Sequence, residues 1–126
     1  MPGFEAESVV ATFVAGTIVR VPFPYTDRDT RQHRPALVVS HGGLGPDRAL
    51  LWVAMITSAS NRRWADDVAI EGDHATVGLP VASLVRTAKL ATIDAAAATP
   101  LGTLDAARFA QVRAALAGHL GLAGTG

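Results

Sequence analysis

The sequence predicts a small, mainly antiparallel β-barrel closed by one C-terminal helix. Several short apolar segments alternate with segments rich in turn-forming residues, and a single amphipathic helical pattern stands near the C-terminus. A chain of 126 residues is long enough for one domain with its own core. The composition, 49% apolar and 17% charged, excludes a disordered chain. The elements below are therefore expected to build one domain.

The first two strands are expected on either side of a polar loop. Residues 16–23 alternate with a period of two, and residues 36–39 form a continuous apolar run that is typical of a strand buried on both faces. Residues 25–33 are polar and charged, as in a surface loop. Arg34 stands where the second strand begins, so the sequence places a cation at the entrance of a buried strand. Such a charge requires a partner or a function.

Three further strands are expected in the middle of the chain. Residues 49–57 are the most apolar and predict a central strand, and residues 68–70 predict a short one. Residues 83–86 and 90–93 predict one strand that is bent or bulged between its halves. Glycine and proline mark loops at residues 41–47 and 71–80.

The helix is expected over residues 105–120. Asp105 is a suitable N-cap, and Gly121 is a suitable end. The apolar stripe that would pack against the barrel consists of Phe109, Val112, Leu116 and Leu120.

Charge and composition narrow the classes of function. The formal net charge is zero, but residues 17–64 hold seven arginines and three aspartates, a local net charge of +4 that can bind phosphate. The absence of cysteine excludes disulfides and thiolate chemistry, and the histidines share no metal-ligand spacing, so neither a metal nor another cofactor is expected. No apolar run is long enough for a membrane helix, and the start is a poor secretion signal. A cytoplasmic protein without membrane contact is expected.

Five sequence elements, in this order, resemble the MazF/PemK family of toxin endoribonucleases. They are Gly16-Thr-Ile-Val-x-Val-x-Phe, Arg34-Pro-Ala-Leu-Val-Val, Ile56-Thr-Ser, Ser83-Leu-Val-Arg, and Thr92-Ile-Asp followed by the helix. The resemblance implies an SH3-like barrel of the MazF/PemK/CcdB type over residues 16–122, with residues 1–15 as an extension and 123–126 as a tail. It also implies a homodimer, metal-independent and sequence-selective cleavage of single-stranded RNA, and neutralisation by an antitoxin protein.

The family pattern assigns the catalytic residues. It carries a phosphate-stabilising arginine onto Arg34 and a strand-end threonine onto Thr57. A guanidinium matches phosphate oxygens with two parallel donors, and a hydroxyl can donate to a non-bridging oxygen. The pattern also carries an arginine used by some members onto Arg86.

The surroundings supply candidates for RNA binding. Hydroxyl, basic, imidazole and aromatic side chains suit contacts to phosphates and unstacked bases. These candidates are Ser58, Arg28, Arg31, His33, Arg62, Arg63 and Trp64.

Each assignment has a structural alternative. Arg34 could be a buried ion-pair partner of Asp27 or Asp94, and the Thr57 hydroxyl could satisfy a loop amide. Arg86 could lie in solvent. An imidazole beside Arg34 suits a general base, yet the loop position of His33 favours a solvated residue. Residues 62–64 could be a solvated turn with its tryptophan capping the barrel.

Two departures from the family pattern leave a second function open. The carboxylate that some members use two residues after the arginine is Ala88 here, and the arginine often found before the Thr-Ile-Asp element is Ala91. The alternative is a catalytically degenerate barrel that binds a partner protein or nucleic acid without cleavage.

Overall fold

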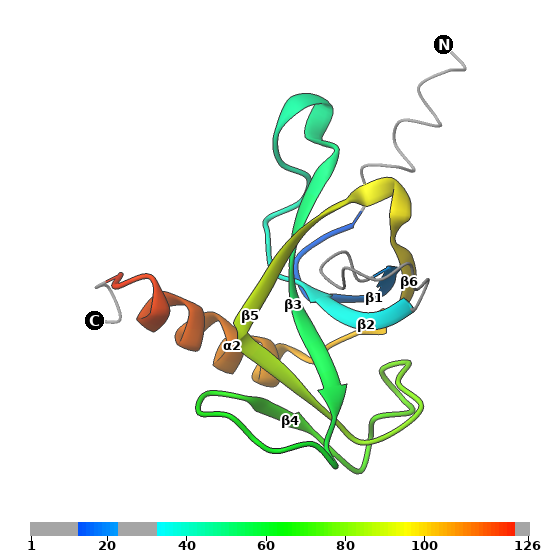
Figure 1. Ribbon diagram of the computed structural model, residues 1–126, viewed down its shortest axis with the longest axis vertical. Helices are drawn as coiled ribbons and strands as arrows, with labels where there is room; N and C mark the ends of the chain where they lie inside the picture. The colour runs from blue at the N-terminus through cyan, green and yellow to red at the C-terminus, as the bar shows by residue number, and fades with distance from the viewer. Residues whose placement is uncertain (1–12, 23–32, 123–126) are drawn as a thin grey trace.

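The computed structural model describes residues 13–22 and 33–122. Within them, one six-stranded antiparallel sheet curls into a half-barrel, and one α-helix lies beside it (Figure 1). The spatial strand order is β4-β5-β3-β2-β1-β6. The strands are β1 (Thr17–Pro22), β2 (His33–Val38), β3 (Leu50–Ser58), β4 (Val68–Ile70), β5 (Ser83–Asp94) and β6 (Thr99–Thr103), and the helix is α2 (Ala106–His119). The predicted fold class is confirmed.

The sheet is buried on both of its faces in its central strands. Alternating side chains of β1, β2, β3 and β5 pack into two separate apolar clusters. One cluster includes Ile18, Leu37, Ile56 and Val85 and receives Val112 from α2. The other cluster consists of Val19, Val21, Ala36, Val38, Leu51, Val53, Met55, Ile93 and Ala95. The continuous apolar runs of the sequence correctly indicated this two-sided burial.

β5 is one long strand with an irregularity in its middle, as the sequence predicted. Its pairing with β3 runs Ala54–Leu90 and then jumps to Met55–Arg86. The intervening residues 87–89 therefore have no partners on β3, which bends β5 and separates its two halves. This bulge begins directly after Arg86, so it affects where that side chain lies.

The helix α2 begins and ends where the sequence predicted. The Asp105 carboxylate accepts a hydrogen bond from the backbone N–H of Arg108 at 3.0 Å, and Gly121 follows the C-cap residue with a φ of 69°. One part of the predicted apolar stripe is wrong. Leu120 is 69% exposed, because it lies at the C-cap after the last turn that packs on the sheet.

Two further predictions differ from the structure. β6 was not predicted, because Pro100 and Gly102 are unusual in strands. Among the described strands β6 lies at the edge, next to β1, and an edge strand tolerates such residues. Residues 41–47 are not wholly loop, since the 3₁₀ turn η1 (Pro46–Arg48) begins there and Leu44 bridges to Leu50. Short 3₁₀ turns are common connectors. A second such turn, η2 (Ala95–Ala97), links β5 to β6.

Candidate functional site

Three strands carry the predicted catalytic residues on one face of the sheet. Met55 of β3 pairs with Ala36 of β2 on one side and with Arg86 of β5 on the other. Side chains two residues apart on a strand share a face, so Arg34 lies on the face of Ala36 and Thr57 on the face of Met55. The structure thus places Arg34, Thr57 and Arg86 on the same face of three neighbouring strands.

The surroundings of Arg34 bear on the structural alternative of a buried ion pair. Its side chain is exposed, although β2 is buried from Ala36 onward, so the expected buried cation is wrong. Asp94 pairs with Leu50, at the opposite end of β3 from Thr57, and therefore cannot be the partner of Arg34. Asp27, the other suggested partner, lies outside the described residues. The Arg34 side chain thus lies at the surface, where β2 begins.

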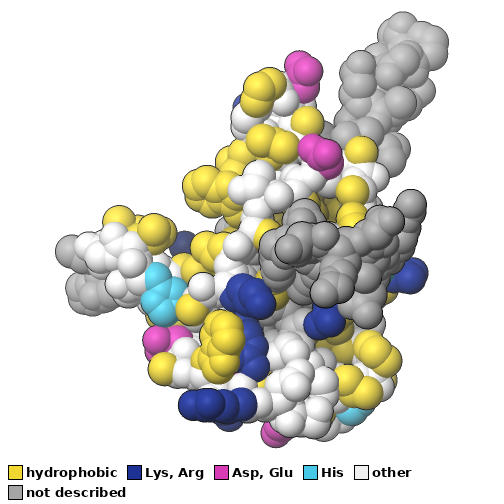
Figure 2. Space-filling view, in the orientation of Figure 1, with side chains coloured by type: hydrophobic (Ala, Val, Ile, Leu, Met, Phe, Trp, Pro, Cys, Tyr) yellow, Lys and Arg dark blue, Asp and Glu magenta, His cyan; other side chains and the backbone are white. Residues whose placement is uncertain are grey.

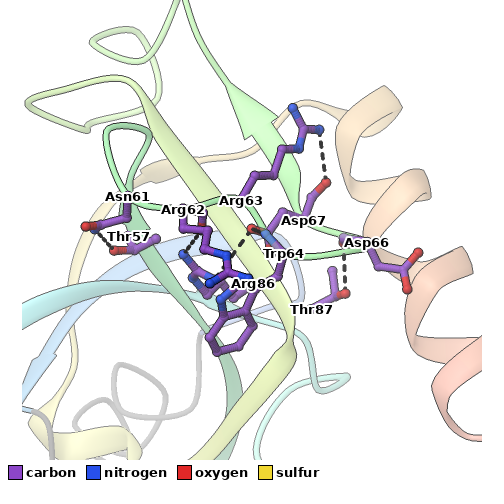
Figure 3. A network of polar contacts seen from close by, with 9 residues as sticks. All are labelled: Thr57, Asn61, Arg62, Arg63, Trp64, Asp66, Asp67, Arg86 and Thr87. Carbon is purple, nitrogen blue, oxygen red and sulfur yellow. Dashed lines mark hydrogen bonds and ion pairs between the residues drawn. The ribbon is translucent and has the colours of Figure 1, made fainter.

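Hydroxyl groups gather where β3 ends. The Thr57 hydroxyl oxygen accepts a hydrogen bond from the Asn61 side-chain amide at 2.6 Å (Figure 3). The hydroxyls of Ser58 and Ser60 lie 2.9 Å apart, and the Ser58 oxygen also accepts from the Ser60 backbone N–H. Because Thr57 accepts its bond from Asn61, its own hydroxyl hydrogen can still be donated. Asn61 thus holds the Thr57 hydroxyl in position, and the residue is only half-buried, so it stays partly open to solvent.

Arg86 is buried, not solvated. Only 6% of the residue is exposed, and its Nη2 donates to the backbone carbonyl of Arg62 at 2.6 Å. The central guanidinium carbon lies 3.9 Å from the centroid of the Trp64 ring, so the indole covers the cation (Figure 3). A guanidinium covered in this way reaches a substrate only if Trp64 moves. Its catalytic contact stays a prediction.

Asp67 is a residue of this site that sequence reasoning missed. Val68 of β4 pairs with Val85 of β5, which brings the preceding residue, Asp67, beside Arg86. One Asp67 oxygen lies 3.8 Å from Arg86 Nη1 and also accepts from the Trp64 backbone N–H at 2.8 Å. In the sequence, Asp66 and Asp67 only follow the basic and aromatic residues 62–64. No residue spacing indicates the register of β4 against β5 that brings Asp67 beside Arg86.

Some of the predicted RNA-binding residues belong to the described part of the chain and others do not. Arg62, Arg63 and Trp64 are exposed in the segment between β3 and β4, and His33 is exposed at the start of β2. Figure 2 shows basic side chains in front of β5 on this face. Arg28 and Arg31 lie outside the described residues. In residues 13–22 and 33–122, no group of three or more acidic or imidazole side chains could hold a metal ion.

A second feature is an apolar groove away from these residues. Its volume is about 520 Å³, and both the sheet and the end of the helix contribute to it. Trp52 and Leu90 line it although they are 52% and 46% exposed. The other lining residues are Val39, Ser40, His41, Leu44, Ala91, Thr92, Leu116 and Leu120.

Comparison with known proteins identifies the family. Residues 15–120 match the family described as PemK-like, MazF-like toxin of type II toxin–antitoxin system. The chain belongs to the PemK/MazF family. No match was found among curated protein sequences. As a member of this family, the protein is the toxin of a toxin–antitoxin system.

Solved structures of PemK/MazF toxins share the fold. A MazE–MazF structure from Deinococcus radiodurans is 25% identical, covers 88% of this chain and 97% of that chain, and has a TM-score of 0.69. Mycobacterium tuberculosis toxin MazF-mt6 is 21% identical over 85% and 98% of the two chains, with a TM-score of 0.65. An endoribonuclease in complex with its cognate antitoxin from a mycobacterial species is 21% identical over 88% and 95%, with a TM-score of 0.64.

The PemK/MazF family members are generally endoribonucleases, and several of the similar structures contain an antitoxin. Within the described part of this toxin, no helix is long and apolar enough to span a bilayer.

Proposed function

We propose that this PemK/MazF toxin is a metal-independent endoribonuclease that cleaves single-stranded RNA at selected sequences in the cytoplasm. The observation that carries the proposal is that an exposed arginine, Arg34, and a held hydroxyl, Thr57, lie on one face of adjacent strands. The basic and aromatic residues 62–64 near the end of β3 add support, because such side chains bind phosphates and unstacked bases.

In the proposed reaction, the 2′-oxygen of one nucleotide attacks the adjacent phosphorus. The new bond from that oxygen forms a phosphorane, and the bond from phosphorus to the 5′-oxygen then breaks. The 2′-hydroxyl proton goes to a base, and the 5′-oxygen receives a proton from an acid. Arg34 donates two hydrogen bonds to the phosphorane oxygens, and Thr57 donates its hydroxyl hydrogen to a non-bridging oxygen.

The experiment that tests this proposal is cleavage of a mixed-sequence single-stranded RNA with excess chelator present. Wild type is compared with Arg34→Ala and Thr57→Ala, and Arg113→Ala serves as the control because Arg113 is exposed on α2. We expect cuts at discrete sites that both site variants lose and the control keeps. Cutting that survives Arg34→Ala overturns the assignment of the site.

Ala88 favours a second candidate function, a degenerate toxin that binds RNA or a protein without cleaving RNA. Ala88 is exposed within the bulge of β5, directly beyond Arg86 and Thr87, and brings no carboxylate there. A folded wild-type protein that binds single-stranded RNA but leaves it intact would establish this alternative and exclude the nuclease.

We infer two protein partners, a second copy of the chain and a cognate antitoxin. The antitoxin is supported by the similar structures that contain one. The homodimer is supported by the apolar groove, whose Trp52 and Leu90 are large and exposed. Light scattering of wild type and Trp52→Glu checks the dimer: we expect twice the chain mass for wild type and a single chain for the variant. A monomeric wild type would overturn it.

A further inference from the structure

We propose that Arg86 and Asp67 are positioning residues that hold Trp64 as a stacking platform for one unpaired base of single-stranded RNA. This rests on the proposed function and deepens it. It gives Arg86 a role through Trp64, in place of a direct contact with the reacting phosphate.

The Arg86 side chain binds one short segment at three points. Its Nη2 donates to the Arg62 carbonyl at 2.6 Å, its Nη1 lies 3.8 Å from Asp67, and its central carbon lies 3.9 Å from the centroid of the Trp64 ring. Arg86 comes from β5, so these contacts fasten the segment to the central part of the sheet. In Figure 3, Arg62, Trp64 and Asp67 surround the guanidinium.

Asp67 joins the guanidinium to the backbone of the tryptophan. The same carboxylate oxygen that faces Arg86 accepts the Trp64 backbone N–H at 2.8 Å. The Asp67 carbonyl in turn accepts from Arg63 Nη2 at 3.4 Å. The position of the indole is therefore fixed both through its ring and through its main chain.

The far end of the segment is also fixed. Asp66 has a φ of 69°, in the left-handed region that a side chain other than glycine adopts infrequently. Its carbonyl accepts a hydrogen bond at 3.0 Å from the hydroxyl of Thr87, the residue after Arg86. Arg86 and Thr87 thus hold two successive residues, Asp67 and Asp66.

The buried pair is better suited to fixing geometry than to adding stability. Only 8% of the Arg86 side chain and 1% of the Asp67 side chain are exposed. Within the described residues, Arg86 Nη1 and Asp67 Oδ1 are buried without a hydrogen-bond partner. Removing two charges from water offsets most of their attraction, so such a pair adds little net stability while it restricts the conformation around it.

The platform itself is open to a ligand. Trp64 keeps 42% of its surface exposed although Arg86 covers one part of its ring. Two arginines, Arg62 and Arg63, lie on the same segment, and Lys89 Nζ lies 6.0 Å from the centroid of the ring. All three side chains are exposed. An exposed aromatic side chain among cations binds an unstacked base and its phosphates. A platform that is already ordered costs less entropy on binding.

The first part of the test uses fluorescence and does not need catalysis. Trp52→Phe leaves Trp64 as the single tryptophan, since the chain has two. We expect single-stranded RNA to quench this emission and a fully paired, blunt-ended duplex of equal length to quench it much less. Adding Arg86→Gln or Asp67→Asn should shift the emission before RNA is added and weaken RNA binding about tenfold, within the range for loss of one stacked base. Arg113→Gln is the control and should change neither.

The second part separates positioning from direct catalysis in steady-state cleavage. Arg86→Gln and Asp67→Asn should raise KM about tenfold and change kcat by less than about threefold, as for lost binding common to ground and transition state. Added to Trp64→Ala, Arg86→Gln should have no further effect, because both act through one interaction. Thermal melting confirms that each variant is folded at the assay temperature.

Each outcome decides the matter. A fall in kcat with unchanged KM, or an Arg86→Gln effect that adds to Trp64→Ala, would overturn the positioning role and restore Arg86 as a catalytic residue. Equal quenching by duplex and single strand would overturn the base-stacking platform. If wild type cuts no RNA, the nuclease fails, while selective quenching by single-stranded RNA that Arg86→Gln weakens would still support the platform.

Discussion

Gly78 and Gly102 stand where two distant parts of the chain make backbone contact. A Cβ on Gly102 would lie 2.2 Å from the Val77 carbonyl oxygen, and a Cβ on Gly78 would lie 2.3 Å from the Leu101 carbonyl oxygen. Gly78 belongs to the connection from β4 to β5, and Gly102 belongs to β6. Because β4 and β6 are the two edges of the described sheet, this contact joins the two edges where the described strands do not pair.

Gly102→Ala is therefore expected to destabilise the toxin by more than about 2 kcal/mol, since the new methyl group meets backbone that cannot move aside. The measurement is the free energy of unfolding in urea. Gly118→Ala is the matched control, because the added methyl group would have no atom within 4 Å apart from the neighbouring backbone of α2. That control should gain up to about 1 kcal/mol from helix propensity. A Gly102→Ala protein as stable as wild type would contradict the close contact.

The same contact explains which part of the fold the sequence could predict. Strands β1 to β5 were predicted because their apolar residues follow strand periodicity and are bounded by turns. β6 was missed because its small and ring-constrained residues, Gly102 and Pro100, are selected by the edge position and the close backbone contact. That selection depends on tertiary structure and has no local signal.

The candidate site was predictable to a similar degree. Arg34, Thr57 and Arg86 were predicted from the family resemblance, and strand alternation places them on one face, while their catalytic roles stay predictions. The cover that Trp64 forms over Arg86 and the role of Asp67 were not predictable. They depend on the register of β4 against β5, which side-chain packing decides.

Thr57→Val tests the hydroxyl of the proposed reaction. Valine keeps the shape of threonine but cannot donate to a phosphate oxygen or accept from Asn61, so kcat should fall about 100-fold. Thr57→Ser keeps the hydroxyl and should retain activity within about tenfold, since only the methyl group that helps to hold it is lost. Single-turnover cleavage of a short RNA measures both. Equal activity of the valine and wild-type proteins would remove Thr57 from the reaction.

Acid should weaken the attachment of α2 to the loop before β5. Arg108 forms ion pairs at 2.9 Å with both Asp73 and Asp105. The hydrogen bonds from Arg108 hold the pKa of each carboxyl below its ordinary value, and the two carboxylates raise the pKa of the Arg108 guanidinium. A carboxyl whose pKa is lower in the folded protein adds stability above its unfolded pKa, and that stability is lost as the pH falls toward the folded pKa.

The melting temperature of wild type should therefore decline more steeply than that of Arg108→Leu as the pH falls from about 5 to 3. The decline should be modest, because both carboxylates are exposed to solvent. Arg113→Leu on the same helix is the control and should follow the wild-type slope. Parallel curves for all three proteins would show that the Arg108 pairs do not couple stability to pH.

Thr87→Val should destabilise the toxin because Thr87 is fully buried and its hydroxyl has two partners. The Asp66 carbonyl carries no hydrogen, so the Thr87 hydroxyl must donate to it. The Thr87 oxygen then accepts its second hydrogen bond, and His119 Nε2 is the donor. Valine fills the same space but can make neither hydrogen bond, at a cost of about 0.5–1.5 kcal/mol for each bond lost. Urea unfolding measures this loss.

Thr92→Val provides the comparison, because Thr92 is exposed on the same strand and its substitution should change stability by less than about 0.5 kcal/mol. The Thr87 effect should also extend to Trp64. Asp66 and Trp64 belong to one segment, so release of the Asp66 carbonyl frees the end of the platform that Arg86 holds through Asp67. Thr87→Val in the Trp52→Phe background should therefore change Trp64 emission as well as stability. Loss of stability with unchanged emission would show that Thr87 supports the core and α2 independently of the platform.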